Sequence, residues 1–185
     1  MYRFKKTYVK LSKNWFWKYG WLVLIALFLA GRYIYFMPKF DGGELAPVFE
    51  ASLRDGQHFD LEQWRGSYVI VHFWGSWCGP CRRNNPAMVQ LYENLHRDAA
   101  ETQHRLEIVS IGIETDSNRW ARAIEKDGLI WPYHISSFKR FDDPIARLYG
   151  VREIPSYYLL DPKGVILAHN PSPESVISLV KAGVN

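Results

Sequence analysis

The stretch that decides the fold runs from Val69 to Cys81 and reads VIVHFWGSWCGPC. Its first half is apolar, β-branched and aromatic, which is typical of a strand covered on both faces, and we expect that strand over 67–74. Its second half holds both cysteines of the chain, Cys78 and Cys81, separated by two residues. Two cysteines at this spacing, directly after a strand, predict a redox pair.

Two other interpretations of the cysteine pair are open at this point. A structural zinc site needs four ligands, usually several of them thiolates, but the chain has no third cysteine and no histidine within a few residues of the pair. An inert disulfide between cysteines three positions apart would close a very short loop and remove little entropy from the unfolded chain. Both interpretations are therefore weaker than redox chemistry.

The sequence on either side of this stretch predicts alternating strands and helices. An Asp-Gly turn within 54–56 favours an opening β-hairpin of segments 48–53 and 57–61. Apolar residues three and four positions apart predict a helix from about 78 to 99. We expect further strands over 105–113, 131–135, 156–160 and 165–169, and further helices over 117–126 with Ser117 as its cap, from Asp143 to Gly150, and over 173–182. Because the last two strands form a hairpin, the pattern predicts an α/β fold with a mixed central sheet.

A second apolar segment lies near the N-terminus, from Tyr19 to Met37, with Arg32 as its one charged residue. Its 19 residues would form a helix about 28 Å long, close to the hydrocarbon thickness of a bilayer. Six basic residues and no acidic residue precede it, a bias that keeps an N-terminus on the cytoplasmic side. The sequence therefore predicts a basic cytoplasmic segment over 1–18, a transmembrane anchor over 19–37, a linker over 38–47 and an extracytoplasmic domain over 48–185.

A cleaved signal peptide and a buried helix of a soluble protein are the alternatives to an anchor. The uninterrupted apolar run from Tyr19 to Gly31 is short enough for a signal peptide. A cleavage site needs small residues at both the −1 and −3 positions, but Ala30 is paired with Phe28, and Gly31 with Leu29. Aromatic residues gather at both ends of the segment, as in the interfacial belts of membrane helices. We therefore expect an uncleaved anchor.

The net charge of +4 belongs to the N-terminal region. Residues 1–39 hold eight of the 23 Lys and Arg and no Asp or Glu, which leaves 15 basic and 19 acidic residues, a net charge of −4, in 40–185. An acidic domain without a basic patch is a poor partner for nucleic acid, so we expect none. The basic N-terminal residues are instead expected to meet anionic headgroups of the lipid bilayer.

From about residue 46 to residue 183 the chain resembles the thioredoxin superfamily, and more closely its membrane-tethered extracytoplasmic branch, the TlpA/ResA-like thiol-disulfide oxidoreductases. The motifs that carry this resemblance are Ala46-Pro47, the segment 61–66 that leads into the strand, Trp77 to Cys81, Pro86, and Gly150 to Pro155 followed by Leu159-Leu160-Asp161. The resemblance implies a thioredoxin-like fold, in which helices flank a central mixed β-sheet and a β-hairpin opens the domain. One transmembrane helix would precede this domain.

The resemblance also implies roles for the residues around the cysteines, without a cofactor or a metal. Cys78 would be the attacking nucleophile, because the N-terminus of a helix lowers a thiol pKa toward about 7 in such sites. Cys81 would be the resolving thiol, and Trp77 would line the surface that faces the substrate. Arg82 and Arg83 either favour the thiolate electrostatically or lie on a solvated helix face, and the second is expected.

Four further residues would shape the site in such a family member. Gly79 and Pro80 would set the geometry of the loop, and the same Gly-Pro pair occurs in thioredoxin itself, which favours reduction. Pro155 would follow a cis peptide bond and lie against Cys78. Ile154 would offer backbone hydrogen bonds to a substrate strand.

The chain departs from thioredoxin at His72, where thioredoxin has a buried aspartate and the tethered branch often has asparagine. His72 either assists the deprotonation of Cys81 or is a hydrogen-bonded core histidine, and we favour the core residue. Glu114 follows the strand expected over 105–113, at about the place where some tethered relatives have an acidic residue near the cysteines. It is a second candidate for proton transfer.

Together these features predict an enzyme, anchored to the bacterial inner membrane, that reduces disulfides of exported proteins on the periplasmic or other extracytoplasmic side. That compartment is oxidising and the anchor has no cysteine to relay electrons, so a separate membrane electron donor is expected. Cytochrome c maturation is a common task of the family, which makes apocytochrome a candidate substrate. The alternatives are oxidation of substrates, a thiol peroxidase of the same fold, and a non-enzymatic membrane-tethered binding module. The Pro-x-x-x-Thr-x-x-Cys arrangement of thiol peroxidases is missing before Cys78.

Overall fold

The computed structural model describes residues 13–97 and 106–183. The chain divides after Met37 into two units. Helix α1, Lys13–Phe36, belongs to the first unit. Its segment Tyr19–Phe36 has a mean hydropathy of 1.5 and no buried residue, so it is long and apolar enough to cross a membrane. It is the one such helix in the described part of the chain.

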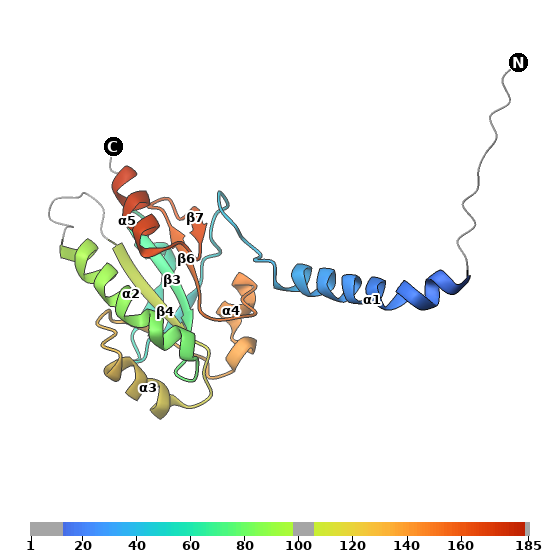
Figure 1. The fold of residues 1–185 in the computed structure, drawn as a ribbon. Coiled ribbons are helices and arrows are strands. Elements are labelled where there is room, and N and C mark those ends of the chain that lie inside the picture. The colour runs from blue at the N-terminus through green and yellow to red at the C-terminus, as the bar shows by residue number, and fades with distance from the viewer. Residues whose placement is uncertain (1–12, 98–105, 184–185) are drawn as a thin grey trace, which may run out of the picture. The chain divides into compact units, whose positions relative to one another are not determined.

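The second unit contains the predicted mixed sheet (Figure 1). Its strands are β3 (Tyr68–Trp74), β4 (Leu106–Gly112), β5 (Tyr133–Ile135), β6 (Ser156–Leu160) and β7 (Ile166–His169), in the order β5-β4-β3-β6-β7. Strand β3 pairs in parallel with β4 and antiparallel with β6. The predicted hairpin also forms, as a separate antiparallel pair of β1 (Glu50–Ser52) and β2 (His58–Asp60).

The helices of this unit agree with the sequence pattern except at some ends. They are α2 (Gly79–Arg97), α3 (Ser117–Lys126), α4 (Pro144–Tyr149) and α5 (Pro173–Ala182), with short 3₁₀ turns η1 (Leu61–Trp64) and η3 (Arg140–Asp142). The expected cap at Ser117 is wrong by one residue, because the Asp116 carboxylate accepts the hydrogen bond from the Arg119 backbone N–H at 3.0 Å. The expected helix end at 99 and strand start at 105 lie outside the described residues.

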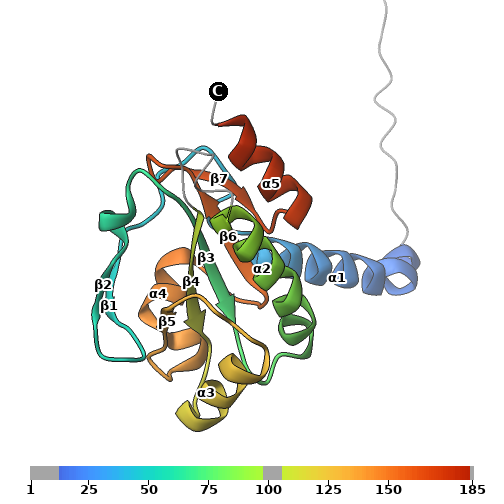
Figure 2. The same ribbon diagram turned by 90° about the vertical axis from the view of Figure 1, so that its left-hand side faces the viewer.

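The sheet separates two apolar layers, because side chains along β3 alternate between its faces. Val69, Val71 and Phe73 pack with the β1–β2 hairpin and α4 on one face. Ile70 and Trp74 pack with α2, α3 and α5 on the other. Figure 2 shows the hairpin and α4 on the side of the sheet away from α2 and α5. All residues of β3 are buried as a result, which explains its almost continuously apolar sequence.

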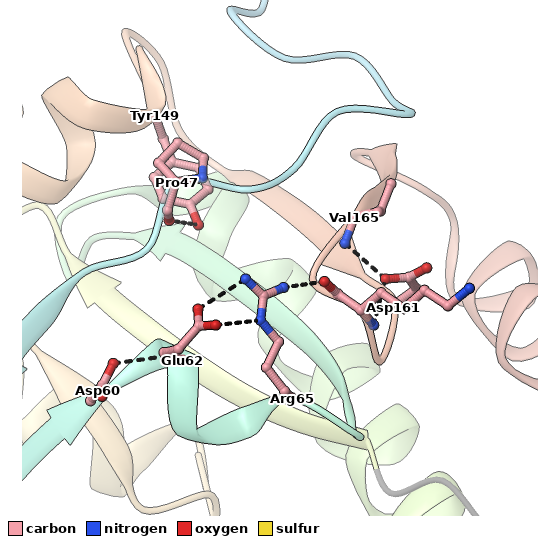
Figure 3. Close-up of polar contacts among 8 residues, drawn as sticks. Pro47, Asp60, Glu62, Arg65, Tyr149, Asp161 and Val165 are labelled. Carbon is pink, nitrogen blue, oxygen red and sulfur yellow. Dashed lines mark hydrogen bonds and ion pairs between the residues drawn. The ribbon is translucent and has the colours of Figure 1, made fainter.

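An arginine network connects the segment before β3 with the turn between β6 and β7 (Figure 3). The Arg65 guanidinium donates from Nε and Nη2 to the Glu62 carboxylate, at 3.1 and 2.9 Å, and from Nη1 to the Lys163 carbonyl. Asp161 Oδ1 closes the turn by accepting a hydrogen bond from the Val165 backbone N–H at 2.8 Å. The network holds the start of β3 next to the end of β6. The other end of β3 leads into the cysteine loop, and the start of β6 follows Pro155.

We expect Gly164→Ala to lower the free energy of unfolding by about 2 to 3 kcal/mol, measured by urea unfolding of the full chain in detergent micelles. Gly164 has a φ of 77°, where an added Cβ costs about 1 to 2 kcal/mol. That Cβ would also overlap Arg65 Nη1 and displace the guanidinium from Lys163.

Gly56→Ala is the matched control for this change. Gly56 has a φ of 86°, but nothing lies within 4 Å of the point where its Cβ would stand, so only the backbone cost of about 1 to 2 kcal/mol is expected. Equal losses in the two variants would show that the Arg65 network contributes nothing to stability.

Candidate active site

The two cysteines lie at the start of α2, shortly after the end of β3. They form a disulfide across the first turn of α2, with their Cα atoms 5.3 Å apart. Cys78 is 5 % exposed, whereas Cys81 is fully buried at 0 %. Of the two cysteines, Cys78 is therefore the less buried.

The start of α2 favours negative charge on the Cys78 sulfur. The Cys81 backbone N–H donates to Cys78 Sγ at 3.2 Å, as it would to the side chain of a helix-capping residue. No acidic residue lies in the first turn of α2, so nothing there opposes the positive end of the helix dipole. Both features favour the thiolate form of a cysteine at this position.

The segment around Pro155 lies against the reactive sulfur. The Ile154–Pro155 peptide bond is cis, which confirms the expectation drawn from the resemblance. The Ile154 carbonyl oxygen is 3.8 Å from Cys78 Sγ, close enough to accept a weak hydrogen bond from the thiol. A Cβ on Gly75 would lie 2.8 Å from Trp77 Nε1 and 3.2 Å from Ile154 Cδ1. Only a glycine therefore allows these two side chains to approach the backbone this closely. The sequence analysis did not identify Gly75 as a site residue. Its position between the strand and the cysteine motif was the signal that could have identified it.

Trp77 forms an exposed aromatic surface directly before the nucleophile. Its side chain is 37 % exposed, and its Nε1–H donates to the Ile113 carbonyl at 2.7 Å. The Arg140 guanidinium lies over the indole ring, with Cζ 4.6 Å from the ring centroid, and the Phe141 ring meets it edge-on at 6.4 Å. No sequence pattern indicated this contact, because residues 140 and 141 belong to the short turn η3, which is distant in the sequence from Trp77.

Glu114 lies at the base of the cysteine loop. It is 1 % exposed, and its Oε1 accepts a short hydrogen bond from the Ser76 backbone N–H. The parallel pairing of β3 and β4 brings the ends of both strands, and hence these residues, to the same edge of the sheet. Its backbone carbonyl also accepts the Arg140 N–H at 3.1 Å.

His72 lies in the middle of β3, within the layer that contains α2. It is 1 % exposed, with Nδ1 3.4 Å from Ser110 Oγ and its ring stacked near Trp74. Burial, and secondarily the neighbouring His134, lowers the pKa of His72 to about 3. The imidazole is therefore neutral at physiological pH.

Arg82 is not freely solvated as expected, because it forms an ion pair. Its guanidinium makes two 2.5 Å hydrogen bonds to the Asp127 carboxylate, which also accepts from Asn85 Nδ2 at 2.7 Å. Asp127 raises the pKa of Arg82 and joins the start of α2 to the end of α3. Arg83 is exposed, as expected, and its Nη1 is 3.5 Å from where a Gly79 Cβ would stand. Within residues 13–97 and 106–183, no group of three His, Cys, Asp or Glu is arranged to hold a metal ion.

Comparisons with known proteins agree with this geometry. Residues 43–169 match the model of the AhpC/TSA family. Thiol-disulfide oxidoreductase ResA of Geobacillus thermodenitrificans (strain NG80-2) is 30 % identical over 124 residues, which are 67 % of this chain and 66 % of that protein. Thioredoxin-like protein YneN of Bacillus subtilis (strain 168) is 32 % identical over 127 residues, 67 % of this chain and 68 % of that protein. The chain thus matches about two thirds of the length of these relatives.

Solved structures have the same fold. A thiol-disulfide oxidoreductase from Bacteroides fragilis NCTC 9343 is 26 % identical, with a TM-score of 0.63 over 75 % of this chain and 98 % of that one. The thioredoxin domain of a thiol-disulfide oxidoreductase from Bacteroides vulgatus has a TM-score of 0.67 over 80 % of this chain and 100 % of that one, at 24 % identity. The second likeness concerns the fold alone.

Proposed function

Because the chain belongs to the AhpC/TSA family of thioredoxin-like proteins, we propose that it is a membrane-anchored thiol-disulfide oxidoreductase that reduces disulfides of exported proteins. The observation that carries the proposal is the Cys78–Cys81 disulfide at the start of α2, with its accessible sulfur beside the cis Ile154–Pro155 bond. Relatives named thiol-disulfide oxidoreductases support the type of reaction.

The reaction is a pair of thiol-disulfide exchanges. The Cys78 thiolate attacks one sulfur of the substrate disulfide, which forms a mixed disulfide and releases the other substrate sulfur as a thiolate. Cys81 then loses its proton and attacks Cys78 Sγ, which forms the Cys78–Cys81 disulfide and releases the second substrate thiolate. Two electrons pass from the enzyme to the substrate, and the released thiolates take up protons. Trp77 and Ile154 form the surface on which the substrate strand lies.

The second step needs a proton acceptor, because Cys81 is shielded from water. We assign this role to Glu114, whose carboxylate is buried at the base of the cysteine loop. His72 is the weaker candidate, because an imidazole with a pKa of about 3 takes up a proton poorly near neutral pH. We infer that His72 is a neutral core residue.

Glu114→Gln should slow the second exchange step by about 100-fold, since the amide keeps an oxygen to accept the Ser76 N–H but cannot take a proton. The measurement is rapid-quench analysis of the mixed disulfide formed with a model peptide, across a range of pH. His72→Asn is the companion variant and should leave the pH profile of this step unchanged. An unchanged profile in Glu114→Gln would remove Glu114 from the mechanism.

The N-terminal helix supports a proposal for the location of the enzyme. We propose that α1 anchors the chain in the bacterial inner membrane over about 19–37, with residues 1–18 cytoplasmic and the domain from 48 onward extracytoplasmic. The exposed apolar surface of Tyr19–Phe36 and the six basic residues before it support this orientation. Because the compartment is oxidising, a separate membrane protein supplies the electrons.

A trapping experiment tests the proposed function. In Cys81→Ser the mixed disulfide cannot be resolved, so covalent complexes with exported proteins should accumulate, and apocytochrome c is a candidate among them. Cys78→Ser should trap none. A binding module would retain its partners without Cys78, and a thiol peroxidase would consume hydrogen peroxide and trap no protein. Either outcome would contradict the proposal.

A further inference from the structure

The Trp77 surface carries a positive charge that disulfide exchange itself does not require. Arg140 is exposed, and its guanidinium lies 4.6 Å from the centroid of the Trp77 ring. The ring is itself fixed by the 2.7 Å hydrogen bond from Nε1 to Ile113 and by the edge of Phe141. A guanidinium held over an aromatic face loses less freedom when it binds a ligand than a mobile one.

The backbone of Arg140 is hydrogen-bonded to Glu114, whose side chain contacts the cysteine loop. Its φ of 53° lies in the left-handed region, which residues with a side chain rarely adopt. Two backbone hydrogen bonds hold this conformation, from the Arg140 N–H to the Glu114 carbonyl and from the Asp143 N–H to the Arg140 carbonyl, both at 3.1 Å. The Glu114 side chain accepts from Ser76, two residues before the nucleophile. The position of Arg140 is therefore coupled to the site.

A second exposed guanidinium, that of Arg83, lies near the first turn of α2. Arg83 Nη1 is close to Gly79, the first residue of α2. Among the described residues neither Arg83 nor Arg140 forms an ion pair, whereas Arg82 is neutralised by Asp127.

Several carboxylates lie near Arg140 in the chain or near the cysteine loop. Asp142 is exposed and lies 3.8 Å from Arg147, and Asp143 is buried and caps α4. Glu114 is buried and hydrogen-bonded, and Glu153 is exposed beside Ile154.

We propose that Arg140 on Trp77, supported by Arg83, is a recognition site for acidic side chains next to the reacting cysteines of the substrate. An arginine binds a carboxylate through two parallel hydrogen bonds, and stacking on Trp77 presents the guanidinium with its edge free to do so. The positive charge is local, because residues 40–185 carry a net charge of −4. This inference rests on the proposed function, in which Cys78 attacks the substrate disulfide.

The test is the rate at which the reduced full chain, in zwitterionic detergent micelles, reacts with three peptides. Each peptide has the same length and one internal disulfide, flanked by Glu, by Gln or by Lys. The dithiol gives two electrons to the peptide disulfide and becomes the Cys78–Cys81 disulfide. We expect the Glu peptide to react about 10-fold faster than the Lys peptide at low salt, and the ratio to shrink in about 0.5 M salt.

Variants then assign the preference to Arg140. Arg140→Glu should bring the Glu-to-Lys rate ratio to 1 or below, and Arg140→Gln should give an intermediate ratio without a reversed charge. Lys163→Glu makes the same change in net charge at the opposite end of β6 and should keep the wild-type ratio. All variants share the basic N-terminal segment, so its attraction for acidic peptides cancels in the comparison.

Two results would overturn the inference: equal rates for the three peptides, or a wild-type ratio in folded Arg140→Glu and Arg140→Gln, with folding checked by circular dichroism. A failure of the proposed function is distinguishable, because the chain would then reduce none of the peptides, including the Gln peptide.

Discussion

Replacing Cys78 by serine should abolish disulfide exchange, with a loss of at least about 10³-fold in the rate of peptide disulfide reduction. Cys78 is the less buried of the two cysteines, next to Ile154 and at the positive end of α2. A serine hydroxyl in the same position supplies no thiolate, and we expect Cys81 not to replace it because it is fully buried. The measurement is single-turnover reduction of a disulfide peptide by the reduced full chain.

Cys81→Ser is the matched control, because it also leaves one cysteine but keeps the accessible one. It should form the mixed disulfide at close to the wild-type rate and then stall, so that one substrate thiol is released instead of two. Comparable reduction by Cys78→Ser and the wild type would show that the chemistry lies elsewhere.

Acid should destabilise the domain steeply, because two buried histidines are neutral in the folded state. Burial is the main reason that the pKa of His72 falls to about 3 and that of His134 to about 4. Below the ordinary histidine pKa of 6.5, the unfolded chain binds protons at these histidines and the folded chain does not. The free energy of unfolding therefore has its full value above pH 6.5 and decreases as the pH falls. Each histidine removes about 1.4 kcal/mol of unfolding free energy per pH unit until its folded pKa is reached.

The pH dependence of urea unfolding between about pH 7 and pH 4 checks this expectation. Carboxylates also titrate there, so His72→Asn serves as the reference, and its slope should be smaller than that of the wild type by about 1.4 kcal/mol per pH unit. In parallel, the imidazole resonances of His72 should show a neutral ring down to about pH 4 by NMR. Protonation of His72 near its ordinary pKa in the folded protein, with no change of slope in His72→Asn, would be incompatible with a neutral buried ring.

Much of the fold could be predicted because local patterns encode it. The apolar run of β3 indicated a strand with two covered faces, and the structure has one. The cap of α4 at Asp143 and its end at Gly150 could be predicted, because few residue types are favoured at helix ends. Both occur as expected. The cap at Asp116 was missed by one residue, since serine and aspartate at neighbouring positions are almost equally good caps.

The surroundings of the cysteines were less predictable, because they depend on contacts between distant segments. The sequence left Arg82 with two possible roles, and its partner Asp127 lies 45 residues away. The contact of Arg140 with Trp77 depends on the position of η3, which no local sequence pattern predicts. The cis bond before Pro155 was expected only from the family resemblance, since an isolated Ile-Pro pair is usually trans.

The midpoint potential of the Cys78–Cys81 couple tests the central claim of a reductase most directly. The full chain in detergent micelles would be equilibrated with dithiothreitol and glutathione redox buffers, and its reduced fraction read after alkylation. The account predicts a value near that of thioredoxin, about −270 mV, at which the dithiol gives electrons to substrate disulfides. A value near about −120 mV, that of a strong oxidant, would contradict the account and make the protein an oxidase of exported thiols.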